Sequence, residues 1–323
     1  MYMKGICQMK MNFSMKEIFC MKEIFCIKDN LLLLLLLPLL LILSGCSESV
    51  ATSQESQLVV EGWIDAGEFP VVKLTRTVPL SSDNLQLDSL SRYVDRWAKV
   101  TISDGEKTEV LVGRYDDSYF PPFIYTTYSM RGEVGREYRL RVEASDGKVA
   151  EATTRIPAPV AVDSFRVEKT EVDSLFQLYA YVNGRQPCKF FTQVENSQTE
   201  MFSAELGLFD ADMLADSGKA SVKRGRYNLV KDFTPFFKRY ETVRVKLSTL
   251  NADGYAFWRS FEDMIALSRL PLVSVNANLK SNVSGAYGYW LGYGSAFYEV
   301  SIADLLKVEN KKFAKNAITA ITF

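Results

Sequence analysis

The stretch LVVEGWIDAGEFPVVKLT, residues 58–75, decides the fold that we expect for this chain. It holds two apolar runs, 58–64 and 71–75, whose alternation has a period of two rather than 3.6, which is the pattern of a β-strand and not of an amphipathic helix. Between them, residues 65–70 contain a glycine and a proline, as turns do. The stretch therefore predicts two consecutive strands at the start of a β-rich body.

The same alternation continues to residue 159 and contains two hairpin signals. The tripeptide Ser-Asp-Gly stands at 103–105 and at 145–147, each time between alternating runs, and Asp-Gly tolerates the positive φ angles of tight turns. Five or more short strands over about 100 residues are typical of an immunoglobulin-like β-sandwich, which we predict for 58–159. Tyr138 opens one of these strands and is the candidate for the corner tyrosine of such folds.

A second domain is predicted to follow the prolines at 157 and 159, because prolines stiffen the chain and remove hydrogen-bond donors. Its alternating runs predict a β-rich domain at 160–323 with one amphipathic helix near 252–269. Asn251 can cap that helix, and Pro271 follows its end. Its apolar stripe is Tyr255, Trp258, Phe261 and Ile265. We thus predict a mainly β fold, and we expect the stripe to pack in the core.

Residues 1–45 have the features of a lipoprotein signal peptide. Five lysines precede the apolar run 31–43, which is shorter than the roughly 20 residues that a transmembrane helix needs. The run ends in Leu-Ser-Gly-Cys, which is similar to the lipobox of bacterial lipoproteins, so we expect a lipid on Cys46. The alternative is a free cysteine beside an ordinary cleavage site. Residues 46–57 are small and polar, and we expect a flexible tether there.

Cysteine use agrees with a lipid-anchored, disulfide-free protein. Three of the five cysteines lie in the signal segment, so Cys188 is the only one besides Cys46 in the mature chain, and one thiol cannot form an internal disulfide. We expect Cys188 to be buried, because an apolar stretch follows it. The tandem repeat of Met-Lys-Glu-Ile-Phe-Cys at 15–26 leaves Met1, Met15 and Met21 as alternative starts.

Composition and charge exclude several classes of function. The chain has 323 residues, is 47% hydrophobic and 24% charged, and is therefore globular rather than disordered. Beyond residue 45 it has 33 basic and 36 acidic residues, so it lacks the positive charge that drives nucleic-acid binding. It has no histidine, which excludes His-dependent nucleophiles and His-ligated metal sites. We expect no cofactor.

An aromatic loop provides the candidate contact residues for a ligand or a partner. Paired prolines at 121 and 122 favour an extended loop, and aromatic side chains on a loop can stack on a sugar face or contact a partner protein. The alternative is that they cap the end of the sandwich. The candidates are Tyr119, Phe120, Phe123, Tyr125 and Tyr128.

Two further patterns have competing interpretations. In 285–298, tyrosines alternate with glycines; as a strand, this stretch would allow close approach of a backbone or a ring on its glycine face, while its tyrosines either contact a ligand or pack against the helix. The acidic residues Asp210, Asp212 and Asp216 are an incomplete match to a calcium loop, since Met213 and Leu214 stand where ligands are needed. A solvated turn is the alternative.

Several of these segments together resemble the domain-of-unknown-function 4249 family, which comprises lipoproteins of Bacteroidota. Besides the lipobox, the resemblance rests on the segments 58–64, 135–140, 152–157 and 281–288, and it covers roughly 58–294. It implies an envelope setting, since members are often encoded beside TonB-dependent receptors. No activity is established for the family, so there are no family catalytic residues to carry over.

We therefore expect a non-enzymatic binding accessory to a TonB-dependent uptake system. Its predicted partners are the membrane, through the lipid, and a TonB-dependent receptor, but no nucleic acid. It is predicted to be an outer-membrane lipoprotein, either periplasmic or surface-exposed. One alternative is a carboxylate-based glycan hydrolase, which needs two acidic side chains about 5–10 Å apart in a cleft. Another is a structural or adhesive surface protein without a pocket.

Overall fold

A computed structural model describes residues 56–77, 91–196, 200–210, 212–214, 218–225, 233–268 and 279–308. The chain divides into two compact units, Met1–Gln54 and Glu55–Phe323, and all described residues belong to the second. The predictions for the signal peptide, for lipidation of Cys46 and for most of the tether lie outside the described residues.

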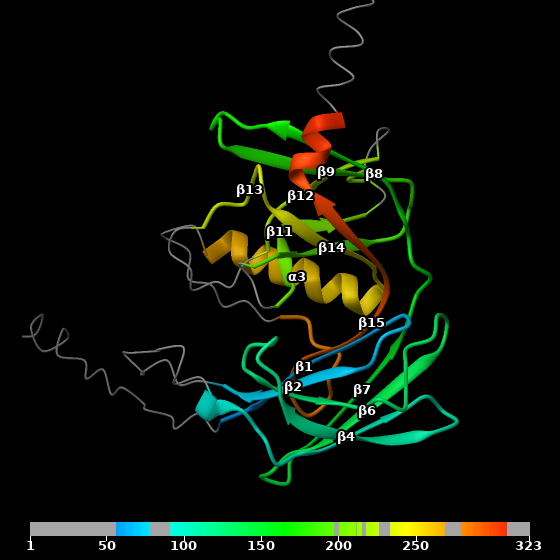
Figure 1. Ribbon diagram of the computed structural model, residues 1–323. Helices are drawn as coiled ribbons and strands as arrows, with labels where there is room; N and C mark the ends of the chain where they lie inside the picture. Colours follow the sequence, from blue (N-terminus) through cyan, green and yellow to red (C-terminus); the bar gives the residue numbers. More distant parts are fainter. Residues whose placement is uncertain are drawn as a thin grey trace, which may run out of the picture. The chain divides into compact units, whose positions relative to one another are not determined.

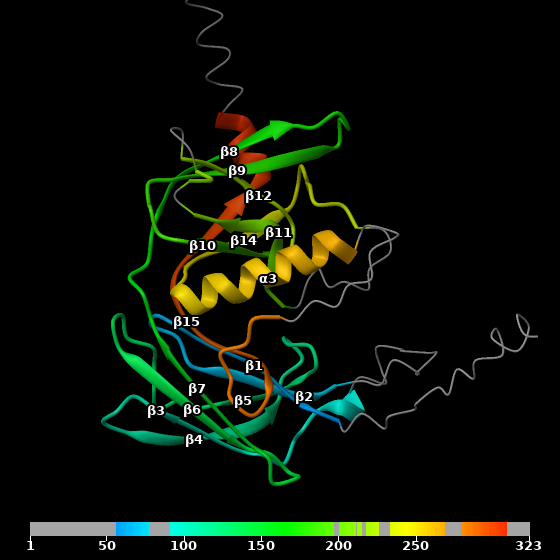
Figure 2. The same cartoon turned by 180° about the vertical axis from the view of Figure 1, so that it is seen from behind.

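The described part of the chain is mainly β, as predicted, and is drawn in Figures 1 and 2. Its strands are β1 (Leu58–Asp65), β2 (Val71–Arg76), β3 (Lys99–Ser103), β4 (Thr108–Tyr115), β5 (Phe123–Thr126), β6 (Glu137–Glu143), β7 (Val149–Arg155), β8 (Val162–Lys169), β9 (Leu175–Val182), β10 (Cys188–Val194), β11 (Phe202–Phe209), β12 (Lys219–Val222), β13 (Phe237–Lys238), β14 (Thr242–Thr249) and β15 (Tyr287–Ser301). A short 3-10 helix η1 (Ser91–Tyr93) precedes β3, and the helix α3 (Ala252–Ser268) precedes β15. A second helix, which was not predicted, follows β15 over residues 302–308.

The strands form an 11-stranded mixed sheet and a four-stranded sheet. The large sheet has the order β11-β10-β14-β15-β1-β2-β5-β4-β3-β6-β7, and in the small one β12 and β13 pair with β9, which also pairs with β8. The 15-residue strand β15 lies inside the large sheet and joins its two groups of strands: its first half pairs in parallel with β1 and its second half pairs antiparallel with β14. Figures 1 and 2 show β15 running from one group of strands to the other.

Both Ser-Asp-Gly sequences form hairpin turns, which confirms these two predictions. The first joins β3 to β4 and the second joins β6 to β7, with antiparallel pairing on each side. Gly105 and Gly147 have φ angles of 90° and 84°, the left-handed backbone conformation that favours glycine. The alternation of buried and exposed residues along β6 follows the period of two seen in the sequence.

The first hydrophobic core lies among the strands β1 to β7. Its largest side chains include Tyr138 and Trp290, both 0% exposed, and the Trp290 indole nitrogen donates to the Tyr138 carbonyl oxygen at 3.0 Å. The Tyr138 hydroxyl donates to the Arg131 carbonyl and accepts from the Glu133 amide. Val283 and Trp290 complete this core although they come from the last part of the chain. The division of domains at residue 160 therefore stays a prediction.

The second core lies between the small sheet and the other end of the large sheet. Apolar side chains of β9 and β12 face those of β10 and β14, and the helix 302–308 adds two more. Cys188 belongs to this core, is 0% exposed and has a free thiol, which confirms its predicted burial. Burial raises the pKa of this thiol to about 11.

The helix α3 begins where the sequence predicts, and its predicted apolar stripe packs in the core only in part, since Trp258 is buried while Tyr255, Phe261 and Ile265 are half-buried. The Asn251 side chain accepts from the Gly254 amide at 2.8 Å, which is an N-cap hydrogen bond. The helix lies against β11 and β15, and its rings Phe257 and Trp258 form a third cluster with Tyr293 of β15 and Phe191 of β10. This aromatic cluster borders the site that is described next.

Candidate functional site

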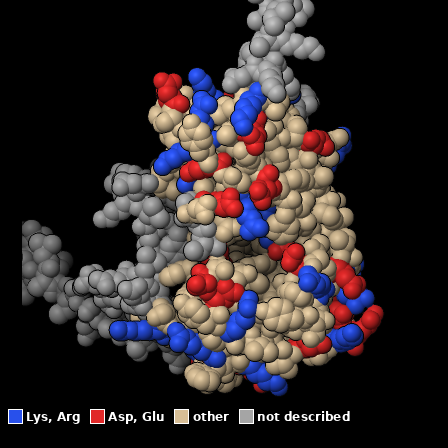
Figure 3. Space-filling view, in the orientation of Figure 1, with Lys and Arg blue, Asp and Glu red and all other residues tan. Residues whose placement is uncertain are grey.

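A large cavity, here called the central cavity, lies between the strands of the first core and the elements around α3. Its volume is about 1430 Å³. Strands β1 and β2 and the segment after β4 form one wall, and β10, β11, β14, β15 and α3 form the other. Figure 3 shows the surface hollowed there, with acidic and basic side chains around the opening. Pockets for single small molecules measure roughly 300–1000 Å³, so this cavity has room for an extended ligand.

Aromatic side chains are enriched in the lining of the central cavity. Among the described residues that line it, 15 of 41 are aromatic, against 12% of the whole chain. These are Trp63, Phe69, Tyr93, Tyr119, Phe120, Tyr128, Phe191, Phe202, Phe257, Trp258, Phe261, Tyr289, Tyr293, Phe297 and Tyr298. Such rings offer flat apolar faces at a low cost in conformational entropy, and their polar tips can hydrogen-bond.

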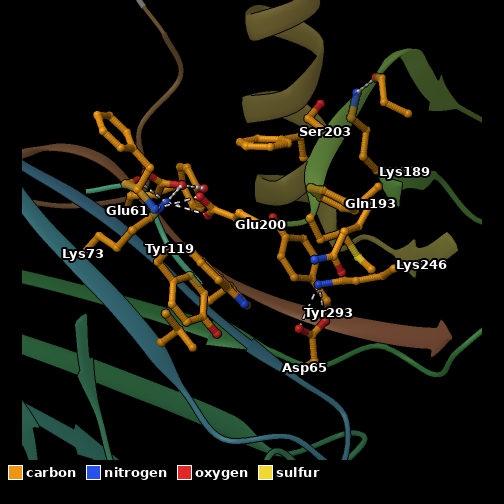
Figure 4. A pocket seen from close by; sticks show the side chains of 18 of the residues that line it. Glu61, Asp65, Lys73, Tyr119, Lys189, Gln193, Glu200, Ser203, Lys246 and Tyr293 are labelled. Atoms are coloured by element: carbon orange, nitrogen blue, oxygen red, sulfur yellow. Dashed lines mark hydrogen bonds and ion pairs between the residues drawn. The ribbon is translucent and has the colours of Figure 1, made fainter. Parts of the chain in front are cut away.

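Lys73 lies at one end of the cavity and binds two carboxylates (Figure 4). Its Nζ lies 2.9 Å from Glu61 Oε1 and 3.0 Å from Glu200 Oε1, and 5.5 Å from the centre of the Trp63 ring. Burial alone would lower the pKa of Lys73, but the two carboxylates outweigh it and hold this pKa above its usual value. Lys73 is therefore a fixed cation and not a proton donor near neutral pH.

Glu61 and Glu200 form the carboxylate pair that a hydrolase mechanism would require. Because both Oε1 atoms bind the same ammonium, they are no more than about 6 Å apart, an upper limit that includes the roughly 5–5.5 Å of retaining glycosidases. Burial and the nearby Glu61 charge raise the pKa of Glu200, against the effect of Lys73 and of the Phe120 amide, which donates to Glu200 Oε2 at 2.9 Å. The Tyr289 hydroxyl donates to Glu61 Oε1 at 3.0 Å.

A second ion pair lies at the other end of the cavity, as Figure 4 shows. Lys246 Nζ lies 2.7 Å from Asp65 Oδ1, and both residues are buried, with 6% and 5% exposure. The ammonium also lies 4.9 Å from the centre of the Phe191 ring and 4.7 Å from that of Tyr293. Aromatic rings around a cation stabilise it by cation–π attraction. Lys246 is therefore fixed in position by Asp65 and by the two rings at this end of the cavity.

A third lysine joins α3 to the sheet. Lys189 is 0% exposed, and its Nζ lies 2.5 Å from Glu262 Oε1 of the helix and 3.2 Å from the Ala204 carbonyl. Burial lowers the pKa of Lys189, and the carboxylate of Glu262 only partly opposes this. The charged side chains that line the cavity are therefore positioned by one another as well as by the backbone.

The structure places three of the five candidate contact residues at the central cavity. Tyr119 has its ring 6.2 Å from that of Trp63, the Phe120 carbonyl accepts from Lys73, and Tyr128 packs edge-on against Phe69. Ligand contact by these three stays a prediction. The other two lie at the first core instead: Tyr125 belongs to it and Phe123 packs against it.

Phe123 and Tyr125 pack edge-on against each other, with ring centres 5.5 Å apart. Tyr125 is 2% exposed; its hydroxyl donates to the Asp95 carbonyl and accepts from the Ala98 amide, and burial raises its pKa to about 12. The prolines that suggested an extended loop precede β5, so the sequence pattern did not distinguish the two rings in this strand from the half-buried Tyr119 and Phe120 before it.

The tyrosine and glycine stretch of β15 has two different faces, as predicted. Its tyrosine face packs against the helix: the Tyr289 ring centre lies 4.4 Å from that of Phe257, and the Tyr293 hydroxyl accepts from the Trp258 indole. On its glycine face, a Cβ on Gly288 would lie 1.9 Å from the Val60 carbonyl oxygen, and the φ angle of Gly288 is 109°. The close backbone approach expected there is thus confirmed.

The charged residues of the cavity were missed by reasoning from the sequence. A usable signal did exist, because Glu61 and Lys73 stand between apolar neighbours on consecutive strands and face each other in the β1–β2 register. Pairing the two predicted strands as a hairpin around the turn at 65–70 would have placed Glu61 and Lys73 side by side. No comparable signal links them to Glu200, which is 127 residues from Lys73 in the sequence.

The possible calcium loop forms a turn around Asp210. This carboxylate accepts from the amides of Asp212 and Met213 and from the Tyr255 hydroxyl. Asp216 lies outside the described residues. Within the described ranges, no three His, Cys, Asp or Glu side chains are grouped so that they could hold a metal ion.

Among the described residues, no helix combines the length and the apolar character needed to cross a bilayer.

Comparisons with known proteins agree with the resemblance seen in the sequence. No protein of curated function matches the chain. A sequence model of a domain of unknown function, DUF4249, matches residues 48–298, which is more than half of the chain. The chain therefore belongs to the DUF4249 family.

Proposed function

We propose that this protein is an outer-membrane lipoprotein of a Bacteroidota species that binds an extended ligand in its central cavity, without chemical conversion, as an accessory to a TonB-dependent receptor. The observation that carries the proposal is the aromatic cavity of about 1430 Å³. A cavity of this size also counts against a purely structural or adhesive role.

The lining favours an oligosaccharide as the ligand. A sugar chain presents flat apolar faces, which can stack on the aromatic rings of the lining. Its edges carry hydroxyl groups, which can hydrogen-bond to the polar groups of the lining. Trp63 and Tyr119 provide rings beside Lys73, while the Glu61 side chain is 41% exposed and can accept from a hydroxyl. The buried ion pairs Lys246–Asp65 and Lys189–Glu262 hold both walls before the ligand arrives. A preformed site loses little entropy on binding.

An immunoglobulin-like sandwich for residues 58–159 is part of the proposal. It is supported by the Tyr138 hydroxyl, which bonds to the backbone five and seven residues upstream, as a corner tyrosine does. The parallel pairing of β1 with β15 is a feature that the antiparallel sheets of such domains do not have.

Titration calorimetry of the purified acylated protein against α- and β-linked glucose, xylose and mannose oligosaccharides tests the ligand class. We expect one class of oligosaccharide to bind. Trp63→Ala and Tyr119→Ala should each weaken its affinity about tenfold, or about 1.4 kcal/mol. Trp97→Phe is the control, since Trp97 does not line the central cavity. If no sugar binds, the ligand class is wrong, and if both variants bind like the wild type, the cavity is not the site.

Affinity purification from native membranes tests the proposed partner. We expect the wild type to recover a TonB-dependent receptor after mild cross-linking, and a Cys46→Ala variant, which cannot be acylated, to recover none. Metabolic labelling with palmitate should mark the wild type alone. Absence of the label in the wild type would contradict the lipid anchor, and absence of the receptor would contradict the accessory role.

A glycan hydrolase remains a second candidate, because Glu61 and Glu200 lie at a suitable separation in the cavity. The raised pKa of Glu200 fits the general acid, and Glu61 would act as the nucleophile. However, the Lys73 ammonium binds both carboxylates and occupies the space between them that a sugar carbon must enter. This arrangement favours binding over hydrolysis.

An assay of reducing ends separates the two candidates. Incubation of the wild type with any bound oligosaccharide should release none, and Glu200→Gln should leave binding within a few fold. Release by the wild type that is lost in both Glu61→Gln and Glu200→Gln would establish the hydrolase and overturn the non-enzymatic role.

A further inference from the structure

The residues before and within β3 form an exposed basic and aromatic surface. Arg92, Arg96, Trp97 and Lys99, here called the Trp97 patch, are all exposed, and Trp97 has 87% of its surface accessible. Figure 3 shows basic side chains gathered at the lower left, over the region of η1. A tryptophan this exposed is unusual, because its large apolar ring is normally covered.

The backbone beneath the patch is held by a buried carboxylate. Asp95 accepts from the Trp97 amide, from the Ser145 amide and hydroxyl and from Arg76, and the Asp95 side chain is 1% exposed. The Asp95 amide also donates to the Leu74 carbonyl of β2. Asp95 therefore points inward while its neighbours Arg96 and Trp97 are exposed, with the Arg96 guanidinium 5.9 Å from the centre of the Phe123 ring, and the patch has a fixed orientation.

Negative charge near the patch is already neutralised. Asp95 and Asp146 bind the guanidinium of Arg76, at 2.9 and 2.5 Å, and Asp146 also lies 3.9 Å from Lys148 Nζ, so two cations balance the two carboxylates. Glu143, which is opposite Lys99 in the β3–β6 register, pairs with Arg141 at 3.2 Å. Arg92, Arg96 and Lys99 therefore present a net positive charge to the solvent. Tryptophan and arginine together are the side chains that settle at a bilayer surface, where the ring enters the interface and the cations meet anionic head groups.

The Trp97 patch lies close to the first described residue of the chain, on the side of the proposed lipid anchor. Ser56, the first described residue, lines the same hollow as Arg92, Arg96 and Trp97, and the Ser56 carbonyl accepts from Lys148 at 3.5 Å. Ser56 stands ten positions after Cys46, and a chain of that length spans at most about 36 Å when fully extended. An acyl group on Cys46 would thus keep Ser56 within about 36 Å of the membrane surface.

We propose that the Trp97 patch docks onto the phospholipid surface that holds the lipid anchor, with Trp97 in the interface and the three cations on anionic head groups. This inference rests on the proposed lipid anchor and adds an orientation to it: the body lies on the bilayer through one defined face. A docked body presents its central cavity at a fixed orientation to a receptor in the same membrane.

Quenching of tryptophan fluorescence by brominated lipids tests the docking, because the other three tryptophans are buried or half-buried. The acylated wild type is reconstituted into phosphatidylcholine vesicles with or without phosphatidylglycerol, both with brominated chains. We expect quenching with phosphatidylglycerol, its loss in Trp97→Phe, and its loss in Arg92→Glu/Arg96→Glu and in 1 M salt. Arg185→Glu/Lys238→Glu carries the same charge change at exposed residues elsewhere, and it should be quenched like the wild type.

Vesicle flotation of the same samples separates the anchor from the docking. Every acylated variant should float with the vesicles, and unchanged near-ultraviolet circular dichroism establishes that each is folded. Flotation of the wild type without any Trp97-dependent quenching overturns the docking but leaves the anchor intact. Failure of the wild type to float overturns both. Quenching that is equal in the two charge-reversed variants also overturns the docking, because the patch would then have no special role.

Discussion

Asp65 and Lys246 form a buried ion pair across β15, with 2.7 Å between Asp65 Oδ1 and Lys246 Nζ, although the two residues stand 181 positions apart in the sequence. Asp65 ends β1 and Lys246 lies in β14, and β15 separates these two strands in the sheet. Ser295 of β15 donates to the same carboxylate. One interaction therefore connects three strands of the large sheet at the point where its two groups of strands meet.

Breaking this pair should destabilise the whole protein. Asp65→Asn leaves the buried Lys246 charge without its partner, and we expect a loss of about 3–5 kcal/mol in the free energy of unfolding. Urea titration with circular dichroism measures it. Asp65→Asn/Lys246→Met should recover part of the loss, because no uncompensated charge then remains. Additive losses in the double variant would contradict this account.

A methyl group at Gly288 should disrupt the pairing of β1 with β15. The added Cβ would lie 1.9 Å from the Val60 carbonyl oxygen, at a φ angle of 109°. We expect Gly288→Ala to cost more than about 3 kcal/mol. Gly105→Ala is the matched control, since its φ angle is 90° but nothing lies within 4 Å of its added Cβ, and it should cost only about 1 kcal/mol. Equal midpoints of thermal unfolding would contradict the steric argument.

Stability should fall in acid through the carboxylates around Arg76. Hydrogen bonds from Arg76 outweigh burial and lower the pKa of Asp146 to about 2, and hydrogen bonds from Ser145 and Arg76 outweigh the larger effect of burial and lower that of Asp95. Both bind protons more weakly in the folded state, so their stabilisation is complete above the usual pKa of 3.8 and is lost as the pH falls toward 2.

Thermal unfolding between pH 5 and 2 measures this effect. Arg76→Gln should have a lower midpoint at pH 5 and a flatter decrease below pH 4 than the wild type. Arg185→Gln, an exposed arginine elsewhere, should parallel the wild type. Since Asp146 is 34% exposed, 1 M salt should reduce the difference between Arg76→Gln and the wild type. Parallel curves for Arg76→Gln and the wild type would contradict the assignment.

The thiol of Cys188 should be unreactive until the protein unfolds. It is fully buried, and its pKa is raised to about 11, so very little thiolate is present at pH 8. With Cys46 acylated, Ellman's reagent should detect no thiol in the native protein and one in guanidinium chloride. A native thiol that is lost on Cys46→Ala would identify an unmodified Cys46, and one that is lost on Cys188→Ala would contradict the burial argument.

Much of the fold could be predicted because it depends on local patterns. The hairpin turns at Gly105 and Gly147, the cap at Asn251 and the end of α3 each follow from a few adjacent residues. The role of β15 could not be predicted in this way. Its pairing with β1 is a contact between the two ends of the chain, and no local pattern specifies which distant strand lies beside it.

The candidate site was predicted only in part for the same reason. The aromatic loop drew attention to Tyr119 and Phe120, which do line the cavity. The charges beside them come from β1, β2 and the residue Glu200 near β11, and each looks like an ordinary surface charge in the sequence. Their grouping depends on the packing of the two walls, and charged residues in a strand are more often exposed than buried.

The long strand β15 has a consequence for how the protein can be divided. Trp290 fills the first core, and the strand's first half covers the edge of β1. A fragment that ends at Pro159 therefore keeps an open sheet edge, which is the kind of edge through which chains associate wrongly. Split versions of the protein should work only by fragment complementation, in which a peptide that carries residues 281–301 restores the missing strand.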